Sequence, residues 1–218
     1  MADDQVLEFA YLKLKDGLAP TDERLVKFLQ QCLAEIQDAG GEHFRFLLSS
    51  PGDDGPREQL LGMTGIWPTD ELHTKFLERG AIMSLLIELG DLLTMKGAVY
   101  LNTPNLSPAQ TEILSARTTT ALFHVGGAGR RAFEETTRDV VGTKPVLAAW
   151  NVTDQASHAK SREFCKDIMD ADQEELQHGG TWGIVVKAQD RGLVAQLQGK
   201  TAGEVEGVEV VTWDAIAV

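Results

Sequence analysis

Residues 65–80 read GIWPTDELHTKFLERG, and the change of pattern inside this stretch decides the fold class. An apolar run ends at Trp67, Pro-Thr-Asp interrupts it, and apolar residues then recur at helical spacing. The stretch therefore predicts a strand that passes directly into a helix, with His73 beside the buried stripe of that helix.

Similar changes of pattern extend over residues 1–104, which we predict to be one unit. Strands are predicted at 6–17, 43–50, 57–67 and 97–104. A helix is predicted at 21–41, with Thr21 as its N-cap and Gly40 at its end, and one or two more lie between 69 and 93, broken near Gly80. The order β-α-β-β-α-β is that of the ferredoxin-like split unit.

After a polar connector at 105–117, the order repeats over residues 118–218. Strands are predicted at 118–125, 145–152, 181–188 and 205–213, helices at 129–142 and 191–199, and an inserted helix at 157–178. A single such unit leaves one face of its sheet bare, so we expect the two units to pack face to face. The predicted fold class is α+β, a pseudo-dimeric barrel of eight mostly antiparallel strands with helices outside.

The strand that ends in Trp67, the Pro-Thr-Asp cap and the helix with Leu72, His73 and Phe76 resemble the dimeric α+β barrel superfamily. The nearest branch resembles the antibiotic-biosynthesis-monooxygenase (ABM) and stress-responsive barrel domains, whose first strand is similar to EFAYLKLKDG (8–17). The resemblance implies a cavity between the two sheets. It also implies a tandem version of domains that usually dimerise, and the chain could itself form a homodimer.

Members of this superfamily include cofactor-free monooxygenases, polyketide and terpenoid cyclases, haem-binding proteins and proteins without known chemistry. The fold alone does not choose among these activities.

The composition of the chain limits the kinds of binding partner that we expect. The chain has 218 residues and a net charge of −13, so it repels phosphate backbones and anionic lipid, and we expect neither nucleic acid nor membrane as a partner. Cys32 and Cys165 are isolated and form no zinc pattern. The N-terminal MADDQVLEF does not read as a signal peptide, so we expect a cytoplasmic protein. No Walker loop, His-Glu-x-x-His motif or cluster of Cys and His occurs, and we expect no metal site and no cofactor.

Four residues are candidates for catalysis. His43 and Arg45 alternate on one predicted strand and would serve as base and anion stabiliser, unless that face is a solvated strand end. His124 closes a strand at the expected cavity mouth and is the second candidate base, or else a buried structural histidine. Tyr11 would donate its hydroxyl to a substrate oxygen, or pack with that hydroxyl at a rim. We expect no catalytic role for His73, whose helix lies outside the barrel.

A second group would bind the substrate. Glu8 lies on the first strand, and four tryptophans lie at or near strand ends, where they would line an aromatic cavity or pack in the core. They are Trp67, Trp150, Trp182 and Trp213. GAGRRA (127–132) fits a dinucleotide fingerprint, but the acidic residue expected about 20 residues later is missing, so we reject that interpretation.

The sequence therefore predicts an enzyme of secondary metabolism, such as polyketide or terpenoid metabolism, that binds a small apolar or aromatic organic substrate between its halves. It would be a cofactor-free cyclase, isomerase or monooxygenase with a histidine base. The alternatives are a non-catalytic ligand-binding or stress-related barrel, and a haem-binding relative.

Overall fold

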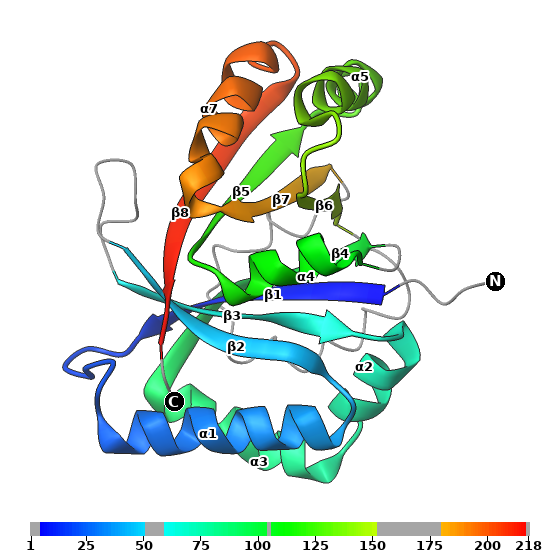
Figure 1. Cartoon of the computed structure of the whole chain (residues 1–218). Coiled ribbons are helices and arrows are strands. Elements are labelled where there is room, and N and C mark those ends of the chain that lie inside the picture. Colours follow the sequence, from blue (N-terminus) through cyan, green and yellow to red (C-terminus); the bar gives the residue numbers. More distant parts are fainter. Residues whose placement is uncertain (1–4, 51–58, 104–105, 152–179, 217–218) are drawn as a thin grey trace.

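The computed structural model describes residues 5–50, 59–103, 106–151 and 180–216. They form one sheet of eight strands in the order β4-β1-β3-β2-β8-β5-β7-β6, in which every neighbouring pair is antiparallel (Figure 1). The predicted helix at 157–178 lies outside the described residues. None of the helices in the described part has the length and apolar content needed to span a bilayer.

The first half follows the predicted β-α-β-β-α-β order, with its second helical segment divided in two near Gly80. Its elements are β1 (Gln5–Leu14), α1 (Glu23–Asp38), β2 (Glu42–Ser49), β3 (Leu60–Trp67), α2 (Asp70–Leu77), α3 (Gly80–Leu92) and β4 (Leu93–Thr103).

The connector contains a helix, and the second half then repeats the order. The elements are α4 (Pro108–Ser115), β5 (Thr118–Val125), α5 (Arg130–Val141), β6 (Leu147–Trp150), β7 (Thr181–Lys187), the short 3-10 helix η3 (Ala188–Asp190), α7 (Arg191–Lys200) and β8 (Val205–Ala215). The predicted α+β fold class is confirmed.

Local signals in the sequence set most helix ends. Thr69 caps α2 by accepting a hydrogen bond from the Leu72 amide at 3.2 Å. Helix α1 is capped by Asp22, which accepts from the Arg24 amide at 2.9 Å, and not by Thr21 as we expected. Gly40 follows α1 with a φ of +91°, a left-handed conformation that glycine adopts without strain.

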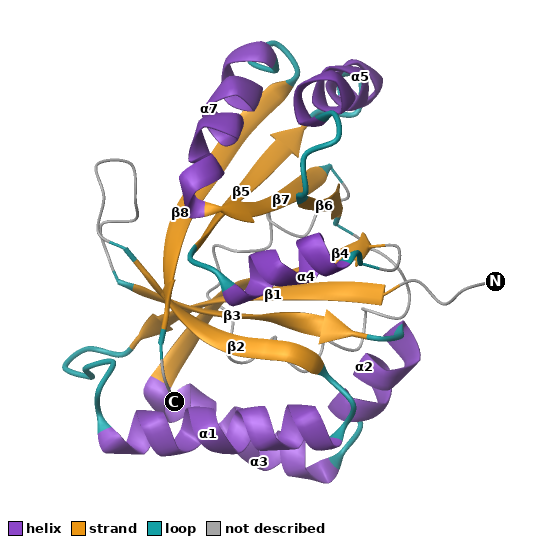
Figure 2. Cartoon of the chain, in the orientation of Figure 1, coloured by secondary structure: helices purple, strands orange, loops and turns teal. Residues whose placement is uncertain are grey.

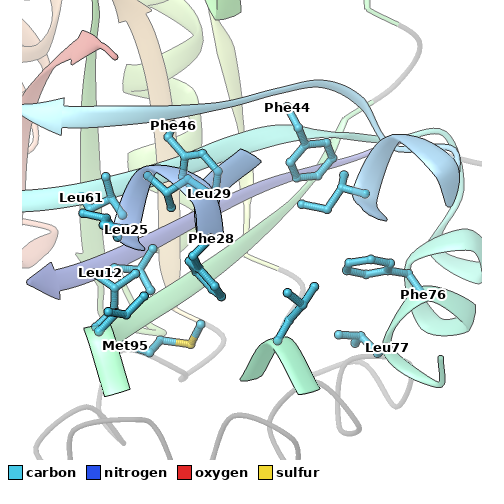
Figure 3. Packing of buried hydrophobic residues seen from close by; sticks show 14 of the residues in the cluster. Leu12, Leu25, Phe28, Leu29, Phe44, Phe46, Leu61, Phe76, Leu77 and Met95 are labelled. Carbon is cyan, nitrogen blue, oxygen red and sulfur yellow. The ribbon is translucent and has the colours of Figure 1, made fainter. Parts of the chain in front are cut away.

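The apolar side chains form three layers. Helices α1, α2 and α3 cover one side of the molecule and α5 and α7 the other, with the strands between them (Figure 2). Figure 3 shows the first outer layer, where Leu29 of α1 lies beside Phe46 of β2. The middle layer joins residues of both halves, including Leu7, Leu122 and Trp213, and it fills the inside of the barrel.

The two halves are related by an approximate repeat of strand register. Leu7 pairs with Leu101 of β4 just as Thr118 pairs with Trp213 of β8. The halves then join at two seams: Ser49 pairs with Trp213, and an isolated bridge links Leu101 to Asn151. The second seam closes the sheet into a barrel, so both of its edges are covered.

Two glycines let the halves pack closely inside this barrel. A Cβ added to Gly62 on β3 would lie 3.0 Å from the ring of Trp213, which comes from the other half. A Cβ on Gly183, at the equivalent position of β7, would lie 2.9 Å from the side chain of Leu101. Each half therefore inserts a large side chain from its last strand over a bare glycine of its partner half.

Replacing Gly62 by Ala tests this packing. Because an added Cβ would lie 3.0 Å from the fully buried Trp213 ring, we expect Gly62→Ala to lower the free energy of unfolding by about 1–3 kcal/mol in urea titrations. Gly199→Ala, in α7 with nothing within 4 Å of an added Cβ, is the control and should leave stability unchanged or raise it by up to about 1 kcal/mol. Equal effects of the two substitutions would contradict the packing account.

Candidate functional site

Three aromatic rings occupy the barrel interior. The ring centroids of Phe9 and Tyr11 lie 4.9 Å apart, and that of Trp213 lies 5.3 Å from Phe9 and 5.7 Å from Tyr11. Trp213 donates its indole N–H to Thr120 Oγ1 at 2.8 Å. The odd-numbered residues of β1 therefore face the interior, a parity that the sequence left open.

Tyr11 has its hydroxyl in a polar part of this interior. Burial raises the pKa of Tyr11 above its ordinary value, and the nearby negative charge of Glu209 raises it further, whereas a side-chain hydrogen bond with Thr120 opposes the rise. Tyr11 therefore keeps its proton at every physiological pH, so its hydroxyl is able to donate a hydrogen bond.

His124 lies on the same interior-facing side of β5 as Thr120 and Leu122. Its Nδ1 is 3.3 Å from Thr181 Oγ1 on β7, and its Nε2 is 3.4 Å from Glu209 Oε1 on β8. The His124 side chain is 26% exposed, so solvent reaches it. Gly207, opposite on β8, carries no side chain that would crowd the imidazole ring.

Glu209 lies beside the partly exposed imidazole of His124, and its negative charge also acts on the buried phenol of Tyr11, whose hydrogen-bond partner is Thr120. A carboxylate beside an imidazole fixes its tautomer and stabilises the imidazolium ion that forms when it accepts a proton. The arrangement can therefore take a proton from a bound molecule and donate a hydrogen bond to an oxygen of it. The sequence pointed to His124 and Tyr11 but not to Glu209 and Thr181. These two residues lie beside His124 because of how β7 and β8 pair with β5, and that pairing cannot be seen in the sequence.

The two polar residues predicted on β2 do not share one environment. The register of β2 shifts between Glu42 and Arg45, and His43 at this bulge has a φ of +56° and an exposed side chain. Arg45 is partly buried at the interior and donates from its Nη2 to the Ala116 carbonyl oxygen at 2.7 Å. The bulge breaks the alternation from which we expected the pair to face one cavity together.

Glu8 lies on the opposite side of the sheet, beneath α2. Its Oε2 accepts from Trp67 Nε1 at 2.7 Å and lies 3.9 Å from His73 Nε2. Burial raises the pKa of Glu8 to about 7, while hydrogen bonds from Trp67 and Tyr100 oppose that rise. The ring of His73 packs between those of Trp67 and Tyr100, with centroids 5.2 and 5.0 Å away.

The other tryptophans also lie on the helix-covered side of the sheet. Trp182 packs against Phe133 of α5, with ring centroids 5.3 Å apart. The Arg130 guanidinium lies 4.0 Å from the ring centroid of Trp150, whose Nε1 donates to Glu134 at 2.8 Å. Of the four tryptophans expected around a cavity, Trp213 alone belongs to the interior cluster that both halves share.

The described histidines do not fit the axial ligand of a haem inside the barrel. His73 is enclosed between two aromatic rings, both nitrogens of His124 face protein oxygens, and His43 is exposed at the bulge. Within the described ranges, no three His, Cys, Asp or Glu side chains gather in a way that could hold a metal ion.

Comparison with known proteins supports the fold. No family model matches the chain, and no curated protein matches it. A candidate monooxygenase from Fusobacterium nucleatum superposes with a TM-score of 0.56 at 8% identity, covering 100% of this chain and 94% of that one. A second, from Lactobacillus acidophilus, has a TM-score of 0.52 at 10% identity, with 98% and 94% covered.

Chlorite dismutase from Candidatus Nitrospira defluvii, in complex with imidazole, superposes with a TM-score of 0.55 at 12% identity, covering 98% of this chain and 92% of that one. These structural neighbours are members of the dimeric α+β barrel superfamily that the sequence resembles. At such low identity the likeness shows the fold, and the activity has to be argued from the residues of this chain.

Replacing Glu8 by Gln tests the buried carboxyl. A glutamate carboxyl ordinarily has a pKa of 4.5, and the pKa of Glu8 is about 7 in the folded protein, so the folded state binds this proton more tightly. The contribution of Glu8 to stability is complete below pH 4.5 and is lost as the pH rises to 7. Gln keeps an oxygen for Trp67 but carries no charge. We therefore expect Glu8→Gln to match wild type at about pH 4 and to exceed it at about pH 8 by on the order of 1–3 kcal/mol.

Urea titrations at acidic, near-neutral and mildly alkaline pH measure this difference, with Glu42→Gln at an exposed glutamate of β2 as the control. Parallel pH profiles of wild type and Glu8→Gln would show that Glu8 does not bind the proton as described.

Proposed function

We propose that this protein is an enzyme that binds a small apolar or aromatic organic molecule at the barrel interior and acts on it by proton transfer. The position of His124 carries the proposal: the imidazole is partly exposed on the interior face and is held between Glu209 and Thr181. A cofactor-free isomerase, cyclase or oxygenase of electron-rich phenols needs such a base, and the monooxygenase-like neighbours agree with this class.

The contacts of His124 suggest how the base works. Glu209 accepts the Nε2 proton of the imidazole, which leaves Nδ1 as the basic atom, and the Thr181 hydroxyl donates to Nδ1 until a substrate is bound. After Nδ1 takes a proton from the substrate, the Glu209 carboxylate stabilises the imidazolium ion. The protonated Tyr11 hydroxyl donates to the oxygen on which negative charge develops.

A non-catalytic ligand-binding barrel is the second candidate. It is favoured by the mutual packing of Phe9, Tyr11 and Trp213, which occupies much of the interior with the protein's own rings. In that case His124 and Glu209 would form a rim ion pair, and ligand binding would proceed without turnover.

Replacing His124 by Ala separates the two candidates. With a panel of naphthoquinols and phenolic acids, assayed by oxygen uptake and by product analysis, we expect wild type to turn over at least one compound. His124→Ala should lower that rate by about 10²- to 10⁴-fold, and Glu209→Gln by less, because the base itself remains. His43→Ala, at the exposed bulge, should keep the wild-type rate. Full turnover by His124→Ala would overturn the assignment.

A further inference from the structure

We propose that Arg45 and Thr64 form a binding site for the carboxylate of an aromatic organic acid, next to the end of α4. This inference deepens the proposed function by naming the chemical class of the ligand. It rests on the proposed function only for the reaction that follows binding. Binding alone tests it.

The first observation is an arginine whose charge has no counterion. Arg45 is partly buried, and its pKa is held below the ordinary value by loss of contact with water. Within the described ranges it forms no ion pair, and its one hydrogen bond goes to the neutral carbonyl of Ala116. Its Nε is buried and has no hydrogen-bond partner among the residues that the structure describes. A buried donor of a charged group without an acceptor is costly, so an anionic oxygen there would be strongly stabilised.

The second observation is the buried hydroxyl of Thr64 on the adjacent strand β3. Thr64 is 1% exposed, and its Oγ1 has no hydrogen-bond partner in the described part of the chain. Thr64 pairs with Arg45 across β2 and β3, so both side chains project from the same face of the sheet. One carboxylate oxygen that accepts from Nε and from this hydroxyl would satisfy both groups.

The repeat shows that the fold does not require these polar residues. Thr64 pairs with Phe9 and Arg45, whereas at the equivalent positions of the second half Val185 pairs with Thr120 and Leu147. Leu147 and Val185 are both buried and belong to the interior cluster. Since leucine and valine fill these positions in one half, the arginine and threonine in the other half point to a role beyond packing.

The neighbours of the pair indicate what the rest of the ligand is. Phe9 pairs with Thr64 on the side away from Arg45, and its ring contacts those of Tyr11 and Trp213. Ile113 and Leu114 of α4 belong to the same cluster, and Figure 1 shows α4 between the strands of the two halves. An acid with an aromatic body fits these surroundings, because the ring would meet apolar and aromatic side chains while its carboxylate meets Arg45.

Titration of the full-length protein with 2-naphthoate and with its neutral analogue 2-naphthamide, at constant ionic strength in a calorimeter, tests the proposal. We expect naphthoate to bind wild type at least tenfold more tightly than naphthamide, because a carboxylate accepts charge-assisted hydrogen bonds from arginine. Acetate should bind more weakly than naphthoate, since it lacks the aromatic body.

Three variants assign the binding to the site. Arg45→Met should weaken naphthoate at least tenfold and leave naphthamide unchanged. Arg117→Met removes a mostly exposed arginine near the same seam, which pairs with Asp214, and should leave naphthoate binding at the wild-type level. Thr64→Val should weaken naphthoate about threefold or more, while the urea midpoint without ligand stays the same or rises, because the lost hydroxyl has no partner within the described ranges.

Equal affinity for the acid and the amide, or naphthoate binding that survives Arg45→Met, would overturn the proposed site. Acetate binding as tightly as naphthoate would overturn the aromatic class of ligand. If the site binds naphthoate as expected but His124→Ala turns over substrate normally, the proposed function fails and the binding site remains.

Discussion

The structure depends on the close packing of large side chains against two strand glycines. Trp213 lies over Gly62 and Leu101 lies over Gly183, and in each pair the side chain and the glycine come from different halves. This exchange fills the barrel interior and brings β2 beside β8 and β4 beside β6. A half by itself would expose these side chains and both sheet edges to water, so the two halves stabilise one another.

Within this shared interior, the two residues proposed to bind and to act on a ligand, Arg45 and His124, lie near opposite ends of β5. Arg45 bonds to the carbonyl of Ala116, just before β5 begins, and His124 lies at its other end. Thr118 and His124 are six residues apart, or roughly 20 Å along the strand at about 3.3 Å per residue. A ligand whose carboxylate is held at Arg45 would extend past Phe9 and Tyr11 toward His124. A ligand that reached both the proposed anion site and the proposed base would have to span about this length, roughly 20 Å.

The sequence predicted the order of the elements better than it predicted the site. Strand and helix periods and the Pro-Thr-Asp stop at 68–70 were sufficient for the β-α-β-β-α-β pattern in each half. The sequence did not show which residues of β1 face the interior, because β1 is apolar on both faces. Leu7, Phe9 and Tyr11 face the interior, and Val6 and Leu12 face the helices. Glu8 and Trp67, expected at a cavity, consequently lie beneath α2.

Two other features could not be read for different reasons. The bulge at His43 interrupts the alternation, and the sequence does not signal its left-handed conformation, which residues other than glycine adopt uncommonly. The role of Glu209 depends on the pairing of β8 with β5, two segments that lie about 80 residues apart in the sequence. Long-range strand register follows from tertiary packing, so a single sequence specifies it weakly.

The two halves share one interior, and native-state hydrogen exchange tests whether they unfold as one cooperative unit. The measurement compares the most protected amides of the β1–β3 pair, around Phe9 and Thr64, with those of the β5–β7 pair, around Ala121 and Ile184. We expect equal free energies of opening for the two groups, with the same dependence on denaturant. Exchange of one group at a lower free energy, while the other stays protected, would show that the halves unfold independently and would contradict this expectation.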